Sequence, residues 1–352
     1  MYFVLLFYFI FATPMKKKAT IHDIARELNI NASTVSRALA DSPRVKEKTK
    51  KLIQEKAAEM GYSRNHLASN LRTQRTHTIG VIVPNISRHF FSTVIGGMEE
   101  IVSEQGYNLI ICQSHDSAER EAQLVDTLLA NQVDGIILSI ATEQSDGSHI
   151  QRIEASGKPV VFFDRECKTI QGHNVLIDDF SRAYELTDSL IQNGCRHIVH
   201  LGGNSEASIY QDRLRGYKDA LEKNNIEFQE DWVFKSRLKQ LDGQEIAQQL
   251  LAKDKMPDAI FSANDVAAIA AMEVLQKAGI RIPEEIKVFG FSGEPISAYT
   301  SPALSTVNQN PNLMGQKTAE LLLDQINGTQ LPVHNTIIPS EIIIRQSSLK
   351  TD

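Results

Sequence analysis

The sequence has few cysteines and lacks the common motifs of nucleotide binding and hydrolysis. The three cysteines, Cys112, Cys167 and Cys195, share no metal-ligand spacing, which predicts reduced, buried thiols and excludes a disulfide framework. No GxGxxG follows a first strand, and there is no P-loop, HExxH helix or nucleophile elbow with a Ser/His/Asp set. We therefore expect a chain that is not an enzyme and that needs no cofactor and no metal.

Long apolar runs are also lacking. The run from Tyr2 to Ala12 is too short to span a bilayer, which needs about 20 residues. The lysines at 16–18 follow this run, whereas a signal peptide carries its basic residues before it. A signal anchor is the alternative, but we interpret residues 1–14 as a leader foreign to the native protein, with translation from Met15, and expect no membrane partner.

Charge is distributed unevenly along the 352 residues, which exceed what one core supports. Residues 15–77 hold 14 Lys/Arg and 6 Asp/Glu, a balance of +8. The remainder holds 37 − 14 = 23 Lys/Arg and 43 − 6 = 37 Asp/Glu, a balance of −14. A basic head on an acidic body is typical of a DNA-binding module joined to another domain, although a solvated lysine-rich helix would give the same imbalance.

Helical periodicity begins directly after Thr20. Thr20 is a natural N-cap with Asp23 three residues later, and Asn29–Asn31 breaks the first helix. A second helix is expected at about 32–40 and a third at about 47–60. Two short helices joined by a three-residue turn, with a third closing the core, fit a helix-turn-helix. A generic three-helix bundle would show the same periodicity.

The residues of this head carry a family resemblance. The run ATIHDIARELNINASTVSRAL, with its T-V-S-R core, closely resembles the signature of the lactose-repressor family of bacterial transcriptional regulators. The resemblance continues through GYSRNHLASNLRTQRTHTIGVIVP and, more loosely, to about Arg345. It implies base-reading roles for Ala32, Ser33 and Arg37, of which arginine can contact guanine bidentately. Phosphate contacts are expected from Asn31, Thr34 and Ser36.

The same resemblance implies a hinge helix after the head. Its minor-groove wedge would be Leu71, with Ala68 on the neighbouring face, and such wedges bend the duplex. Two positions depart from the family pattern: Arg64 replaces a proline at the start of the hinge helix, and Ser69 replaces an arginine. Because of these two departures, the sequence supports a hinge helix less strongly than it supports the helix-turn-helix.

From Ile79 onward, apolar strands alternate with amphipathic helices. Eight buried strands are predicted in the runs TIGVIVP, YNLIICQ, VDGIILSI, PVVFFD, NVLIDD, HIVHLGG, PDAIFSAND and EIKVFGFSG. Such alternation predicts parallel, doubly wound α/β sheets, and eight strands fit two lobes better than one sheet. The strand ends carry polar residues, where ligands of such sheets bind.

The body resembles the periplasmic sugar-binding-protein fold. This resemblance implies a ligand site formed by Phe91, Asp164, Arg165, Arg213, Asn264, Asp265 and Ser292. Arginine, amide and carboxylate groups suit a polyol, because each buried hydroxyl needs a partner. Phe90 is expected in the core, and Asp265 has the alternative role of capping a helix. Ser292 stands where the family often has an aspartate, which leaves room for an anionic or phosphorylated ligand.

The sequence thus predicts an all-α helix-turn-helix head on a two-lobed α/β body. The expected boundaries are residues 15–62 for the head, 63–77 for the hinge, 78–345 for the body and 346–352 for a tail. Lobe 1 is expected at about 78–177 and 306–337, and lobe 2 at about 178–305 and 338–345. The predicted function is a cytoplasmic, nucleoid-associated repressor, a homodimer (a tetramer stays open) that binds a pseudopalindromic operator and a sugar-like effector. The rivals are a membrane-tethered sugar receptor and a regulator controlled by a partner protein.

Overall fold

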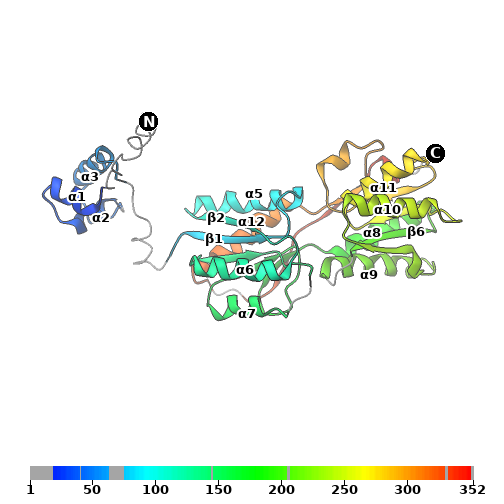
Figure 1. Ribbon diagram of the computed structural model, residues 1–352, viewed down its shortest axis with the longest axis horizontal. Helices are drawn as coiled ribbons and strands as arrows, with labels where there is room; N and C mark the ends of the chain where they lie inside the picture. The colour runs from blue at the N-terminus through cyan, green and yellow to red at the C-terminus, as the bar shows by residue number, and fades with distance from the viewer. Residues whose placement is uncertain are drawn as a thin grey trace, which may run out of the picture. The chain divides into compact units, whose positions relative to one another are not determined.

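The computed structural model of the chain describes residues 19–39, 41–62, 75–143, 146–203, 207–329 and 332–349. The chain divides into two units, a head of residues 1–74 and a body of residues 75–352, and Figure 1 labels many of their elements. The predicted leader of residues 1–14 and the hinge residues Ala68 and Leu71 lie outside the described residues.

The head is a cluster of three helices, α1 (Ile21–Glu27), α2 (Ala32–Leu39) and α3 (Glu47–Glu59). The predicted cap is confirmed: the Thr20 hydroxyl accepts from the Asp23 amide, and the Asp23 carboxylate accepts from the Thr20 amide at 2.9 Å. The turn between α1 and α2 has Asn29 at φ 50°, a conformation that asparagine tolerates. The core consists of buried residues from all three helices and the loop before α3: Ile24, Ala25, Val35, Ala38, Val45, Ile53 and Ala57.

Lobe 1 of the body is built on one parallel sheet, ordered β11-β5-β4-β3-β1-β2. Its strands are β1 (Thr78–Val83), β2 (Asn108–Gln113), β3 (Gly135–Leu138), β4 (Val160–Phe163), β5 (His173–Leu176) and β11 (Asn335–Ile337). One face is covered by α5 (His89–Glu104) and α12 (Pro311–Ile326), the other by α6 (Ala118–Ala130) and α7 (Ser148–Ala155). The two helix layers appear above and below the sheet in Figure 1.

Lobe 2 repeats this plan on a smaller parallel sheet, ordered β7-β6-β8-β9. Its strands are β6 (Ile198–Gly203), β7 (Val233–Ser236), β8 (Ala259–Ser262) and β9 (Lys287–Phe289). The helices pair as α8 (Asp179–Gln192) with α9 (Ser208–Lys223), and α10 (Gln240–Leu251) with α11 (Asp265–Lys277). Short 3-10 turns lie at Glu230–Trp232, Pro295–Ala298 and Gln346–Ser348.

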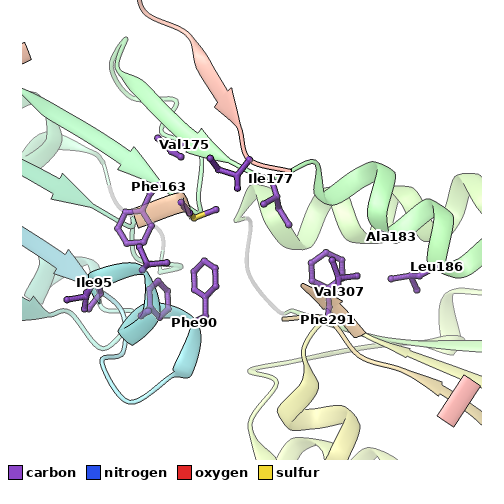
Figure 2. Packing of buried hydrophobic residues seen from close by; sticks show 14 of the residues in the cluster. Phe90, Ile95, Phe163, Val175, Ile177, Ala183, Leu186, Phe291 and Val307 are labelled. Atoms are coloured by element: carbon purple, nitrogen blue, oxygen red, sulfur yellow. The ribbon is translucent and has the colours of Figure 1, made fainter. Parts of the chain in front are cut away.

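The chain passes between the lobes three times: after β5, between β10 (Thr306–Asn308) and α12, and between β11 and β12 (Glu341–Ile343). One apolar cluster includes residues of both lobes. Figure 2 shows Ile177 on the first crossing, with Phe163 and Val175 on one side and Ala183 and Leu186 on the other. The apolar residues next to the first crossing therefore belong to one cluster that joins the cores of lobe 1 and lobe 2.

The structure confirms the two-lobed α/β fold but corrects three details. The pair β10–β12 is antiparallel, and the short or exposed strands β7, β10, β11 and β12 escaped the search for buried runs. The run YNLIICQ was predicted as a buried strand, but β2 is an edge strand with Ile110 39% and Ile111 43% exposed. Cys112, also on β2, is only partly buried, whereas Cys167 and Cys195 are buried; all three are free thiols.

Within the described ranges, none of the helices has the length and apolar content that a membrane span requires.

Candidate functional site

The head presents the predicted DNA-contacting residues on an accessible helix. Val35 and Ala38 of α2 are buried and pack in the core of the head. Ser33 and Arg37 on the same helix are exposed, as is Asn31 immediately before it, and Ala32, Thr34 and Ser36 are partly exposed. The base-reading and phosphate-binding assignments therefore remain predictions on side chains that a duplex could reach.

Two cations of the head, Arg37 and Lys50, differ in whether their charge is available to DNA. Arg37 forms no ion pair with any described residue, so its guanidinium is available. Lys50 is 7% exposed and donates to the Asp41 carboxylate. That hydrogen bond raises the pKa of Lys50, so this lysine is a structural cation and does not belong to a DNA-binding surface. The count of charges along the sequence could not separate these two roles.

A cavity of about 700 Å³ lies in the body and is lined by residues of both lobes. Its walls come from the carboxyl ends of the parallel strands, including Pro84 after β1, Asp164 after β4 and Ala263 after β8. Six of the seven predicted ligand residues line it: Phe91, Asp164, Arg165, Arg213, Asn264 and Ser292. Its size is typical of a small-molecule site.

Four residues of the cavity lining have strained backbone conformations. His115, Asp116, Asp164 and Ser292 line the cavity with positive φ values of 57°, 62°, 65° and 144°. Such conformations are costly for residues with a side chain and concentrate at functional sites. These residues lie just after β2, β4 and β9, where the chain turns away from the sheet.

Arg213, on α9, is held tightly although it lines the cavity. It is 3% exposed; its Nε donates to Asp179 Oδ1 and its Nη1 to the Ala263 carbonyl oxygen, both at 2.7 Å. Its guanidinium carbon lies 3.8 Å from the centre of the Phe291 ring. Burial raises the pKa of Asp179 to about 7, although Arg213 acts in the opposite direction. Arg213 thus compensates a buried carboxylate and still has N–H groups for a ligand.

Asn264 takes the capping role that was the alternative for Asp265, and it also lines the cavity. Asn264 is the N-cap of α11: its Oδ1 accepts from the Ala267 amide and its Nδ2 donates to the Leu238 carbonyl oxygen, each at 2.8 Å. Asp265 is fully buried and absent from the cavity wall, because it accepts from Thr306 Oγ1 and the Glu294 amide. Burial raises its pKa to about 6. Asp265 ties α11 to two loops beside the cavity, and the ligand role expected for it remains a prediction.

Asp164 and Arg165 form a buried polar pair on the lobe 1 side. Arg165 Nη1 donates to Asp116 Oδ1 at 2.7 Å, and its Nε lies 3.6 Å from Asp164 Oδ2. Burial raises the pKa of Asp164. The Arg165 Nε is buried without a hydrogen-bond partner, so it can donate to a ligand oxygen.

Phe90 and Phe91 are both 7% exposed and pack edge to face, with ring centroids 5.1 Å apart. Phe91 also meets Phe163 at 6.2 Å. Both rings belong to the apolar core and line the cavity, so they offer an apolar wall. Ser292 lies opposite in lobe 2 with a partly exposed side chain.

Gln309 is a cavity residue that the sequence reasoning missed. It is 4% exposed, lines the cavity, and its Oε1 is buried without a partner. It follows β10, a strand of three residues too short to be recognised by apolar periodicity. A buried unpaired carbonyl is costly unless a donor reaches it, and a ligand hydroxyl would supply that donor.

The cavity lining offers hydrogen-bonding groups and no cluster of metal ligands among the described residues. In the part of the chain that the structure covers, no group of three or more His, Cys, Asp or Glu residues could hold a metal ion. The lining residues Arg165, Arg213 and Gln309 carry hydrogen-bond donors and an acceptor, which suit a ligand rich in hydroxyl groups.

Comparisons with known proteins find relatives for both the head and the body. Residues 20–65 match the family described as bacterial regulatory proteins, lacI family, and residues 187–348 match a periplasmic binding protein-like domain. The chain is 30% identical over 330 residues to catabolite control protein A of Priestia megaterium, covering 94% of this chain and 99% of that protein. It is also 30% identical to the ribose operon repressor of Haemophilus influenzae, covering 94% and 98%.

The fold has solved counterparts as well. The lac repressor dimer bound to operator and the anti-inducer ONPF superposes with a TM-score of 0.85 at 24% identity, covering 95% of this chain and all of that one. The helix-turn-helix head, the two-lobed body and the relatives together show that the chain belongs to the lacI family of bacterial regulatory proteins, as a DNA-binding transcriptional repressor and not an enzyme.

Proposed function

We propose that the chain represses transcription as a homodimer on a pseudopalindromic operator, and that a small sugar-like ligand in the body cavity controls its affinity for DNA. In this proposal residues 15–62 read DNA, residues 63–77 form the hinge, and residues 78–345 sense the ligand and dimerise. The protein would act in the cytoplasm, at the nucleoid.

The polar, unfilled cavity is the observation that carries ligand control. It holds about 700 Å³ between the lobes, and two residues of its lining, Gln309 and Arg165, each have a buried polar atom without a hydrogen-bond partner. A regulator controlled only by a partner protein would have no need for such a hollow, and its cleft would be filled by side chains. The cavity therefore favours a small molecule as effector.

The ligand class follows from the lining. Hydroxyl groups both donate and accept, so a polyol can satisfy Gln309 Oε1 and the arginine N–H groups at once, while Phe91 offers an apolar face. The name of one relative, the ribose operon repressor, points in the same direction. We infer that the controlled genes serve carbohydrate use.

Two exposed apolar residues at a strand edge support the homodimer. Ile110 and Ile111 lie on the edge strand β2 of lobe 1, 39% and 43% exposed. An open strand edge with apolar side chains invites association. A two-fold dimer places two α2 helices on two half-sites, and the hinge residues Leu71 and Ala68 would then enter the minor groove between them.

Arg37→Ala tests the DNA-reading role. On an operator selected from random DNA by the parent chain, the variant should bind about tenfold to hundredfold more weakly, because one bidentate base contact is lost. Preference should relax at one base position of each half-site, while affinity for random DNA changes less. Fluorescence anisotropy on both kinds of DNA gives the two losses.

Lys51→Ala is the matched control, since Lys51 is an exposed cation on α3. It should weaken specific and random DNA alike, as loss of a phosphate contact does. Equal losses on both kinds of DNA for Arg37→Ala would contradict its assignment as a base reader.

A further inference from the structure

Three cations line the cavity without a carboxylate partner. Arg88 precedes α5 in lobe 1, and Arg237 and Lys239 stand on either side of Leu238 in lobe 2. Among the described residues, no carboxylate forms an ion pair with any of the three. Arg165 and Arg213, by contrast, each lie 2.7 Å from an aspartate oxygen, so their charge is already compensated.

The cavity is more basic than the body around it. Its lining includes five Lys/Arg side chains and four Asp/Glu side chains, and Asp179 beside Arg213 brings this to an even balance, whereas residues 78–352 carry 23 − 37 = −14. The lining cations are Arg88, Arg165, Arg213, Arg237 and Lys239, and the acids are Asp116, Glu143, Asp164 and Glu294. The lining thus lacks the acidic excess of the body and holds three cations without ion pairs among the described residues, which favours an anionic ligand at this place.

The loop that carries two of these cations is fixed by the fold. Leu238 is fully buried with φ 55°, its amide donates to Ser236 Oγ at 3.0 Å, and its carbonyl oxygen accepts from Asn264. A bulky residue keeps a left-handed conformation only where its surroundings hold it there. The buried Leu238 thus anchors the loop while Arg237 and Lys239, both exposed, reach the cavity wall.

Helix N-termini add to the positive field. The N-caps of α5, α6, α10 and α11 are Arg88, Ser117, Lys239 and Asn264, and all four line the cavity. The first turn of a helix presents free amide groups and the positive end of its dipole. Independently, Arg165 Nε is buried at the cavity without an acceptor, which calls for an oxygen ligand.

We propose that the effector is a polyol with an anionic group, a phosphate ester or a carboxylate, held between Arg88 of lobe 1 and Arg237 and Lys239 of lobe 2. The hydroxyl-bearing part of the ligand would face Arg213 and Gln309. This inference rests on the proposed ligand control and names the class of the ligand. An anion contacted from both lobes would also favour their closure over the cavity.

The test is calorimetric titration of the full chain with matched ligands: glucose, glucose 6-phosphate and glucuronate; ribose and ribose 5-phosphate; and inorganic phosphate. At least one anionic member should bind about tenfold or more tightly than its neutral parent, and added KCl should weaken it. If the phosphate esters bind and glucuronate does not, the anionic group is a phosphate; if glucuronate alone binds, it is a carboxylate. A neutral sugar that binds as tightly as its anionic forms, or a series in which no anion binds, overturns the proposal.

The variant Arg237→Gln/Lys239→Gln should lose about tenfold or more of that affinity, and both sites are exposed, so folding should be retained. Lys235→Gln is the matched control: Lys235 is an exposed cation on β7 outside the cavity lining, and its loss should leave affinity unchanged. Full affinity in the double variant contradicts the proposal. Operator binding by the same unliganded preparations tests the proposed function separately, so the two can fail independently.

Discussion

Replacing Arg213 with alanine is expected to lower the free energy of unfolding of the body by about 3–5 kcal/mol and to abolish ligand binding in the cavity. The stability loss arises because Asp179 is 6% exposed and its carboxylate lies 2.7 Å from the Arg213 guanidinium. Without that partner a buried charge is left uncompensated. Urea unfolding of the full chain, followed by the fluorescence of Trp232 in lobe 2, measures the loss.

Two further results separate structural from ligand-binding roles. Protonation of Asp179 would remove the buried charge, so the deficit of Arg213→Ala should be smaller in acid than at alkaline pH. The double variant Arg213→Met/Asp179→Leu should regain most of the stability but none of the ligand affinity. A double variant no more stable than Arg213→Ala would show that the pair does not account for the loss.

The second large effect is expected at a glycine where α5 crosses α12. A Cβ atom at Gly97 would approach the Asn312 carbonyl oxygen more closely than the 3.0 Å that real Cβ atoms respect, whereas one at neighbouring Gly96 would meet nothing within 4 Å. Gly97→Ala should therefore force the helices apart and destabilise lobe 1 by about 1–3 kcal/mol or more.

Gly96→Ala is the matched control on the same helix. It should stabilise the chain by about 0.5–1 kcal/mol, because alanine is the better helix former and the site is open. Thermal unfolding of both variants at one protein concentration gives the comparison. Equal melting temperatures would mean that α5 and α12 do not pack through Gly97.

Local sequence signals were sufficient for the head. Thr20 and Asp23 predict the start of α1 because a capping box is a contact between residues three apart. Asn29 predicts the turn because asparagine tolerates positive φ. Burial of Lys50 against Asp41 escaped prediction, because it depends on how α3 packs beside the loop after α2.

In the body, the strand pattern predicted where the cavity lies but not which side chains line it. The carboxyl ends of the parallel strands of one sheet share one edge, so Asp164 in lobe 1 and Asn264 in lobe 2 were both expected at the ligand site. Both line the cavity. Asp265, one residue further on, is turned into the protein toward Thr306. Adjacent residues diverge in this way at a helix start, and periodicity alone does not say which one faces a ligand.

The remaining differences come from pairings over long sequence distances. Whether β2 is central or at an edge depends on which strands flank it, so its apolar run could not reveal the exposure of Ile110 and Ile111. Gln309 follows β10, whose partner β12 lies more than thirty residues along the chain. The position of Gln309 in the cavity therefore becomes visible only once the pairing of β10 with β12 is known.

Coupling between the cavity and the operator is the central claim, and it is measured by the affinity of the tightest ligand of the series above, determined with and without operator DNA. Linkage requires that operator changes ligand affinity by the same factor by which ligand changes operator affinity. We expect a factor of about 5–150, the same in both directions. A ligand that binds the cavity with equal affinity on and off the operator, and leaves operator affinity unchanged at saturation, would contradict ligand control of this repressor.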